Sequence, residues 1–344
     1  MARSPLFGGA SWTVRAPSHE GWVVAGGGDE LPVALPTLFA VRGAELAGSS
    51  GEIRIYGTEE ARAPDADALA ARLARNHAAL SEAFGAFDAR WDVLPVHYGS
   101  GYESTSGYPS IGVGYRMVGE GDALAHEVAH AWFGARVVPS FDQPGGHWHE
   151  ALATWALMDV DPDAANLLLE FFVNRFRSQT RKRPSVALTQ TAYAEASDGE
   201  KYGKGLAAML TLDATYGRAE VVRAVARWVE QSAGRETTWT DVLAAVEQEL
   251  GAEAAGRLRS WLDGRWVPRL ALQDGVLVVD DDADPDHAIE GAVLVTNASY
   301  DILAELPVQL GRGRVELGPP PEGWAYAFLA GELPVEGPDI YLFR

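Results

Sequence analysis

The sequence predicts an α+β protein in which a sheet-forming region leads into a helical region, with a small β region at either end. Three observations favour this fold class. Residues 1 to 57 hold short apolar runs between glycines and prolines, residues beyond Glu150 show helical periodicity almost throughout, and residues after Pro268 return to valine-rich runs. Short apolar runs bounded by turn residues are typical of strands, whereas apolar residues three and four apart are typical of helices.

The chain of 344 residues is long enough for two or three modest domains. We expect an N-terminal β region at residues 1–57 and a central domain at residues 58–268. The central domain would have a sheet lobe to about residue 119, followed by a helical lobe. A small β-sandwich is expected at residues 269–344.

The elements of the first half follow from their local patterns. GWVVAGGG and EIRIYG read as short strands. After Pro64 a helix is expected, capped by Asp65 or Asp67. Its apolar stripe consists of Leu69, Leu73, Leu80, Phe84 and Phe87. The runs Trp91–Gly99 and Gly107–Val118 read as strands, the second with glycines suited to a sheet edge.

The second half is helical up to a change of composition near Pro268. A helix is expected from about Asp122, which can cap it. Helical patterns then follow one another beyond Glu150, from ALATWALM to AEAAGRLRSWLDG. The acidic turn DDDADPD and the stretch LGPPPEGW separate the later valine-rich runs, which predicts a β-sandwich.

Composition excludes several functional classes. The chain is 47% apolar and 22% charged, which is ordinary for a globular protein, and its 28 basic and 48 acidic residues give a net charge of −20. Such a charge repels phosphate backbones and anionic lipid surfaces, so we expect neither nucleic acid nor a membrane as a partner. The N-terminus lacks the apolar core of a signal peptide, and no apolar run is long enough to cross a bilayer. A cytoplasmic location is expected.

The stretch HEVAH, His126 to His130, carries the clearest chemical signal. Residues four apart share one face of a helix, so His126 and His130 present two imidazoles about one turn apart, which suits a zinc ion. Glu127 can lean toward the open coordination position and take a proton from water. The chain has no cysteine, so any metal must be held by histidine and carboxylate.

The third ligand lies in the downstream segment GGHWHEALATWAL. Glu150 begins a second helix there, with nineteen residues between it and His130. His149 is a competing ligand, because adjacent helical residues point about 100° apart and only one can face the metal. We favour Glu150 as the ligand. His149 would then lie beside the ligands or in solvent, and both His147 and His149 are expected to be loop or rim residues. Thr154, one turn beyond Glu150, could lie near His126 and support it.

These residues resemble the gluzincin metallopeptidases, and in particular the aminopeptidase N family. HEVAHAWFGARVVP is similar to that family's histidine helix, and HEALATW to its Asn-Glu-Gly-Phe-Ala helix, with Glu150 on the ligand glutamate and His149 on the asparagine. The spacing from His130 to Glu150 is one residue longer than is usual in the family. The resemblance covers about Ile53 to Pro268 and implies a thermolysin-like catalytic domain that holds one Zn²⁺ per chain.

Two further segments resemble that family. EKYGKGLAAMLTLDATYG is similar to its Tyr-x-Lys-Gly segment, which implies that Tyr202 donates a hydrogen bond to the oxyanion of the reaction. GSGYEST occupies the place of its Gly-x-Met-Glu-Asn motif, with Gly101, Tyr102 and Glu103 as substrate-binding residues. Glu103 would grip the free amino group of a peptide. Tyr102 and Ser104 depart from the motif, which puts exopeptidase specificity in doubt.

The function that the resemblance implies is a zinc aminopeptidase. Zinc would activate a water molecule for attack on the first peptide bond, with Glu127 as base and then acid. Alternatives are a zinc endopeptidase, a specialised hydrolase of non-peptide substrates, or a binding module without activity. The expected partner is a peptide substrate, and the sequence does not reveal the oligomeric state.

Overall fold

The structure of the chain is a computed structural model that describes residues 22–25, 39–87, 91–96, 105–107, 110–114, 121–180, 185–264, 269–280, 289–297, 302–310, 314–331 and 342–343. The described residues form two compact units. The first comprises the described residues of Met1–Pro139, Ala156–Leu168 and Ala226–Thr237. The second comprises those of Ser140–Trp155, Leu169–Val225 and Thr238–Arg344.

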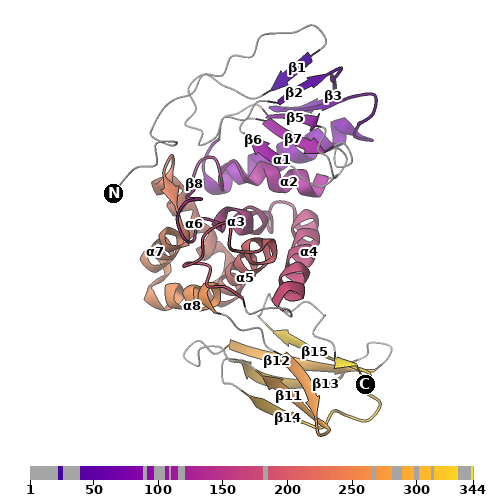
Figure 1. Cartoon of the computed structure of the whole chain (residues 1–344), viewed down its shortest axis with the longest axis vertical. Coiled ribbons are helices and arrows are strands. Elements are labelled where there is room, and N and C mark those ends of the chain that lie inside the picture. Colours follow the sequence, from indigo (N-terminus) through magenta and orange to yellow (C-terminus); the bar gives the residue numbers. More distant parts are fainter. Residues whose placement is uncertain are drawn as a thin grey trace. The chain divides into compact units, whose positions relative to one another are not determined.

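A five-stranded mixed sheet organises the first unit (Figure 1). Its order is β3 (Glu45–Ser50), β4 (Ile53–Gly57), β5 (Trp91–Val96), β7 (Ser110–Gly114) and β6 (Thr105–Gly107). The pairs β4–β5 and β5–β7 are parallel, whereas β3–β4 and β6–β7 are antiparallel. The predicted mixed sheet is therefore confirmed. It includes β3 and β4 from residues 1–57, and the division of the chain into three domains stays a prediction.

Helix α1 (Ala66–Phe84) contacts β3 and β4 of this sheet and the later helix α2 (Gly121–Ala129). The predicted cap is confirmed, since the Asp65 carboxylate accepts the backbone N–H of Ala68 at 3.0 Å. Four residues of the predicted stripe are buried, which are Leu69, Leu73, Leu80 and Phe84. Phe87 follows the end of the helix and is half-buried. Burial of the stripe explains why these residues form a helix against the sheet.

Arg72 of α1 connects three segments that are distant in the sequence. Its guanidinium donates to Asp122 at 2.6 Å and to the two carboxylate oxygens of Asp161 at 2.7 and 2.8 Å. Burial acts to raise the pKa of Asp161, but the hydrogen bonds from Arg72 and Asn76 overcome it and hold that pKa below its usual value. Asp122 lies inside the first turn of α2 and pairs with Arg72, so the prediction that it caps the helix was wrong.

The remaining short strands of the first unit form two-stranded pairs. β1 (Trp22–Ala25) pairs antiparallel with β2 (Phe39–Arg42), and β8 (Val138–Pro139) pairs parallel with β9 (Glu236–Thr237). β1 and β4 confirm the two strands predicted from GWVVAGGG and EIRIYG.

The helical region that the sequence predicts is confirmed (Figure 1). Its helices are α3 (Trp148–Ala156), α4 (Pro162–Thr180), the π-helix η1 (Gly199–Lys204), α5 (Gly205–Tyr216), α6 (Arg218–Ser232), α7 (Trp239–Leu250) and α8 (Ala252–Asp263). α5 contacts η1 and α8, and α7 contacts α8. Helix α3 is buried on all sides, including its polar residues His149, Glu150 and Thr154.

Strands replace helices after Asp263. One antiparallel sheet has the order β10 (Arg269–Gln273), β11 (Val276–Asp280), β14 (Val315–Gly318). A second has the order β13 (Ile302–Leu310), β12 (Ile289–Thr296), β15 (Tyr326–Gly331), β16 (Leu342–Phe343). Valines from both sheets are buried, among them Val278, Val279, Val293 and Val295. Two antiparallel sheets with buried valines are typical of the sandwich that the sequence predicts.

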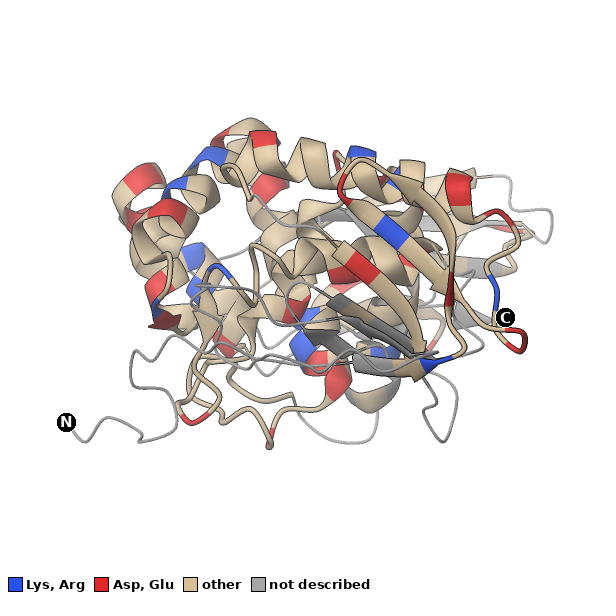
Figure 2. Cartoon of the chain, turned by 90° about the horizontal axis from the view of Figure 1, so that it is seen from above, with Lys and Arg blue, Asp and Glu red and all other residues tan. Residues whose placement is uncertain are grey.

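The charged positions among the described residues are spread over many elements (Figure 2). Acidic positions lie on several helices and strands in Figure 2 and do not gather on one element. Within the described ranges, no helix has both the length and the hydrophobicity to cross a membrane.

Candidate metal centre

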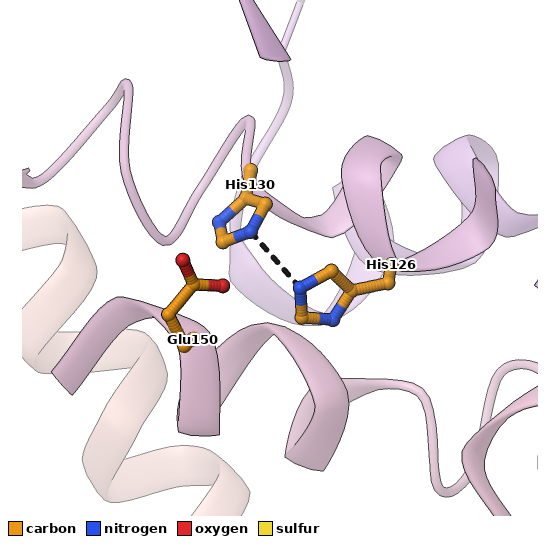
Figure 3. A group of neighbouring side chains, drawn as sticks. All are labelled: His126, His130 and Glu150. Atoms are coloured by element: carbon orange, nitrogen blue, oxygen red, sulfur yellow. Dashed lines mark hydrogen bonds between the residues drawn. The ribbon is translucent and has the colours of Figure 1, made fainter. Parts of the chain in front are cut away.

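The two histidines of HEVAH lie at the C-terminal end of α2. His126 is inside the helix, and His130 follows its last residue, with the backbone N–H of His130 still donating to the carbonyl of His126 at 3.3 Å. The helical turn therefore continues through His130, and both imidazoles lie on one side of it (Figure 3). His126, Glu127 and His130 are all buried.

The environment of His130 sets which of its nitrogens carries the proton. Its Nδ1 lies 2.8 Å from the backbone carbonyl of Phe133, so Nδ1–H donates and Nε2 keeps its lone pair. That Nε2 lies 3.1 Å from Nε2 of His126 (Figure 3). A carbonyl behind a ligand histidine is the usual arrangement in metal sites, because it fixes the orientation of the ring.

Glu150 is the third member of the group. Ligand atoms of His126, His130 and Glu150 all lie within 4.8 Å of one another, and all three residues are buried. Figure 3 shows the Glu150 carboxylate pointing toward the two rings. The structure therefore brings together the three residues that the sequence selected as metal ligands.

The donor set suits zinc. Two imidazole nitrogens and a carboxylate are common zinc ligands, and Zn–N bonds of 2.0–2.1 Å in a tetrahedral site place two nitrogens roughly 3.3 Å apart. The observed separation of 3.1 Å between the two Nε2 atoms is close to that value. A cation between them would also satisfy buried polar atoms whose desolvation is otherwise unfavourable.

Helix α3 is anchored at the end that follows Glu150. At its C-terminal end, Nε1 of Trp155 donates to Asp213 at 2.7 Å, and the guanidinium of Arg218 lies 4.1 Å above the Trp155 ring. Arg218 also donates to Asp213 at 2.8 Å and to the carbonyl of Trp155 at 2.9 Å. These contacts hold the C-terminal end of α3 against α5 and the start of α6.

The two other histidines of this segment differ from expectation. His149 lies inside α3 and is buried, so the prediction of a loop or rim position was wrong for this residue. His147 lies in the turn before α3, as expected for a loop, but it is also buried. Burial lowers the pKa of His147 to about 4, and electrostatic interactions with His149 and the ammonium of Lys201 act in the same direction. His147 is therefore neutral at pH 7.

Tyr202 lies on the π-helix η1, directly before α5. Single-turn π-helices are frequent at functional sites. The ring of Tyr202 stacks on Phe172 of α4, with ring centroids 4.3 Å apart. The sequence predicted α5 but gave no sign of the π-helix, because the six residues GEKYGK contain only one apolar or aromatic side chain, too few to show a periodicity.

Buried charges anchor η1. Glu200 accepts hydrogen bonds from the backbone N–H of Val186 at 2.9 Å and from the Ser197 hydroxyl at 2.7 Å. The ammonium of Lys204 donates to the carbonyls of Val186 at 2.6 Å and Gly264 at 2.5 Å. Both side chains thus hold the turn that carries Tyr202.

Gly205 brings the start of α5 against α3. A Cβ at this position would lie 2.7 Å from Cβ of Ala151 and 2.9 Å from the ring of Trp239. Real Cβ atoms do not approach so closely, so only glycine permits this contact. Ala151 directly follows Glu150, the third member of the ligand group. The Tyr-x-Lys-Gly segment, which ends at Gly205, therefore packs against the residue next to Glu150.

The remaining predicted site residues are Gly101, Tyr102 and Glu103, which lie outside the described residues. Thr154 is buried and its hydroxyl donates to the backbone carbonyl of Glu150 at 3.3 Å. Sequence reasoning missed Tyr193, whose ring stacks on His149 at 5.9 Å between centroids. No local pattern marks Tyr193, because its ring contacts with Phe141 and His149 join segments more than forty positions apart.

Comparison with known proteins supports the fold. No protein-family model matches the sequence, and a comparison with curated proteins found no significant match. Among solved structures, the chain is similar to an M1 zinc metallopeptidase from Deinococcus radiodurans, with a TM-score of 0.58 and 21% identity over 72% of this chain and 62% of that chain. A variant of the metallopeptidase from this organism bound to a Tyr-Ser-Ala substrate gives a TM-score of 0.56, 21% identity and the same coverages of 72% and 62%.

A two-domain M1 zinc metallopeptidase variant bound to L-tryptophan is similar as well, with a TM-score of 0.57, 21% identity, and coverage of 72% of this chain and 62% of that chain. The chain thus spans 62% of the length of these solved structures. The similarity confirms the expected α+β fold, which is that of an M1 metallopeptidase, and the His126, His130 and Glu150 group lies within the part of the chain described here.

Proposed function

We propose that this chain is a zinc-dependent peptidase that uses His126, His130 and Glu150 to hold the metal. The observation that carries the proposal is the group itself, whose ligand atoms lie within 4.8 Å of one another in a buried position. The similarity in fold to M1 zinc metallopeptidases supports it.

The residues around the group suit hydrolysis. When bound, zinc supplies a Lewis acid that makes a water molecule a good nucleophile near neutral pH. Glu127 accepts the proton of that water and delivers it to the leaving amine, as base and then acid. Glu127 is buried, and a site closed to bulk water limits loss of the transferred proton to solvent, which supports this role.

Tyr202 is the proposed donor to the oxyanion that develops on the substrate carbonyl. A phenol remains protonated at neutral pH and can donate without carrying a charge of its own. The contact of Gly205 with Ala151 supports this role, because it packs the Tyr-x-Lys-Gly segment beside the helix of Glu150.

The finer proposal is that the enzyme is an aminopeptidase acting on short peptides, with Glu103 binding the free amino group. This role of Glu103 rests on sequence resemblance alone. In support, a structurally similar M1 zinc metallopeptidase has been crystallised with a Tyr-Ser-Ala substrate, and another with L-tryptophan.

Zinc analysis combined with a panel of aminoacyl chromogenic substrates tests the proposal. We expect one zinc per chain in the wild type and in Glu127→Gln, and a fall in kcat of about 10²- to 10⁴-fold in Glu127→Gln. His130→Ala should lose both the zinc and the activity. Substantial activity in Glu127→Gln would overturn the role of Glu127.

N-terminally blocked peptides test the exopeptidase assignment. An aminopeptidase that anchors the free amine on Glu103 should leave the blocked peptide intact and cleave its unblocked counterpart. Cleavage of both would favour a zinc endopeptidase. Zinc binding without cleavage of either peptide would favour a hydrolase of other substrates or a binding module.

A further inference from the structure

A buried histidine stands directly beside the third ligand. His149 occupies the position before Glu150 on α3, and its Nε2 lies 3.4 Å from Oε1 of Glu150. Both side chains are buried. An imidazole N–H that faces a carboxylate attracts it and so favours one orientation of its oxygens.

The imidazole of His149 is itself held by aromatic rings. Tyr193 stacks on it at an interplanar angle of 21°, and Phe141 meets both His149 and Tyr193 edge-on at 90°, with centroids 5.4 and 4.9 Å away. The ammonium of Lys201 lies 4.1 Å from the centroid of the Tyr193 ring. Offset-stacked, edge-to-face and cation–π contacts are all favourable, so the plane of the His149 ring is fixed.

The tyrosine adds no competing charge. Burial raises the pKa of Tyr193 to about 12, with the negative charges of Glu150 and Asp198 acting in the same direction. The phenol therefore stays neutral at physiological pH. Its ring supports His149 without repelling the carboxylate of Glu150.

We propose that His149 is a positioning residue that holds the Glu150 carboxylate in its metal-binding orientation, and that Tyr193 holds His149. The inference rests on the proposed function, because it requires Glu150 to be a zinc ligand. Residues that hydrogen-bond to a ligand carboxylate commonly change metal affinity by about 10- to 100-fold when they are replaced.

Zinc affinity, measured by competition with a chromogenic chelator, tests the inference without any assay of activity. His149→Phe keeps an aromatic ring against Tyr193 and removes the donor, and should raise the zinc Kd by about 10- to 100-fold. His149→Gln places an amide N–H near the position of Nε2, and should restore the Kd to within a few-fold of wild type.

Variants of Tyr193 distinguish the contribution of its ring to zinc binding from that of its hydroxyl group. Tyr193→Leu removes the stacking partner and should weaken zinc binding, whereas Tyr193→Phe keeps the ring and should bind zinc like the wild type. If His149→Phe does not fold, the comparison of these two variants carries the test. The melting temperature of each metal-free variant identifies general loss of structure.

The outcomes distinguish the two proposals. If the wild type binds zinc and the zinc Kd is unchanged in His149→Phe and in Tyr193→Leu, the positioning role is overturned and the proposed function is left intact. A wild type that binds no zinc would overturn both. The positioning role is supported if His149→Phe binds zinc weakly, His149→Gln binds it with nearly the wild-type Kd, and the melting temperatures of both variants are unchanged.

Discussion

Replacement of Lys204 by methionine tests the claim that a buried cation holds the turn that carries Tyr202. Lys204 is 3% exposed, and its ammonium donates to the carbonyls of Val186 and Gly264 at 2.6 and 2.5 Å. Methionine has a similar length but no donor. Each buried carbonyl that loses its partner costs about 1–3 kcal/mol, so the two together give roughly 2–6 kcal/mol.

Relief from burying an ammonium offsets part of that cost. We therefore expect the free energy of unfolding to fall by about 2–4 kcal/mol. Urea unfolding followed by circular dichroism measures this change, with a chelator present so that metal binding does not contribute to stability. Activity with zinc present should fall as well, because the backbone that carries Tyr202 is no longer fixed.

Arg223→Met is the matched control. Arg223 pairs with Glu220 one turn away on α6, and both side chains are exposed. Pairs of this kind contribute about 0–1 kcal/mol. If Lys204→Met is no less stable than Arg223→Met, the two hydrogen bonds of Lys204 do not hold η1 and the reasoning is refuted.

Further predictions concern the residues around the ligands. Because the pKa of His147 is lowered to about 4 from an ordinary value of 6.5, the metal-free protein should lose stability as the pH falls from about 6.5 toward 4, by on the order of 3 kcal/mol. The stability of His147→Asn should vary less with pH over this range in urea unfolding, and equal slopes for the two proteins would argue against a neutral buried His147. Gly205→Ala should cost about 1–3 kcal/mol and weaken zinc binding, because the added Cβ would lie 2.7 Å from Ala151, next to Glu150. Urea unfolding measures the change in stability and chelator competition measures the zinc Kd. A Gly205→Ala variant with the wild-type stability and the wild-type zinc Kd would show that the contact is not tight.

The sequence alone predicted the main features of the ligand group. The spacing of His126 and His130 on one helix is a local property, and so is the position of Glu150 near the start of the next helix. The sequence favoured Glu150 over His149 as the third ligand, although helical geometry alone says that only one of them faces the metal without saying which. The structure groups Glu150 with the histidines and places His149 against the Glu150 carboxylate.

Contacts between distant segments were not predictable from local patterns. Arg72 joins Asp122 and Asp161, which lie 50 and 89 positions away, and nothing in the sequence of α1 selects these partners. The same holds for Tyr193, which reaches His149 only after the chain has folded. Asp122 illustrates the error that results. Its residue type suits a helix cap, but in the structure it lies inside the first turn of α2 and forms an ion pair with Arg72.

The central claim is that His126, His130 and Glu150 hold a zinc ion that the chain uses for peptide hydrolysis. Titration of the metal-free protein with zinc, while hydrolysis of an aminoacyl chromogenic substrate is followed, tests it most directly. The proposal predicts that the rate rises with added zinc and reaches a plateau at one zinc per chain. A rate that does not depend on zinc, or no hydrolysis of any substrate in the panel at full occupancy, would contradict it.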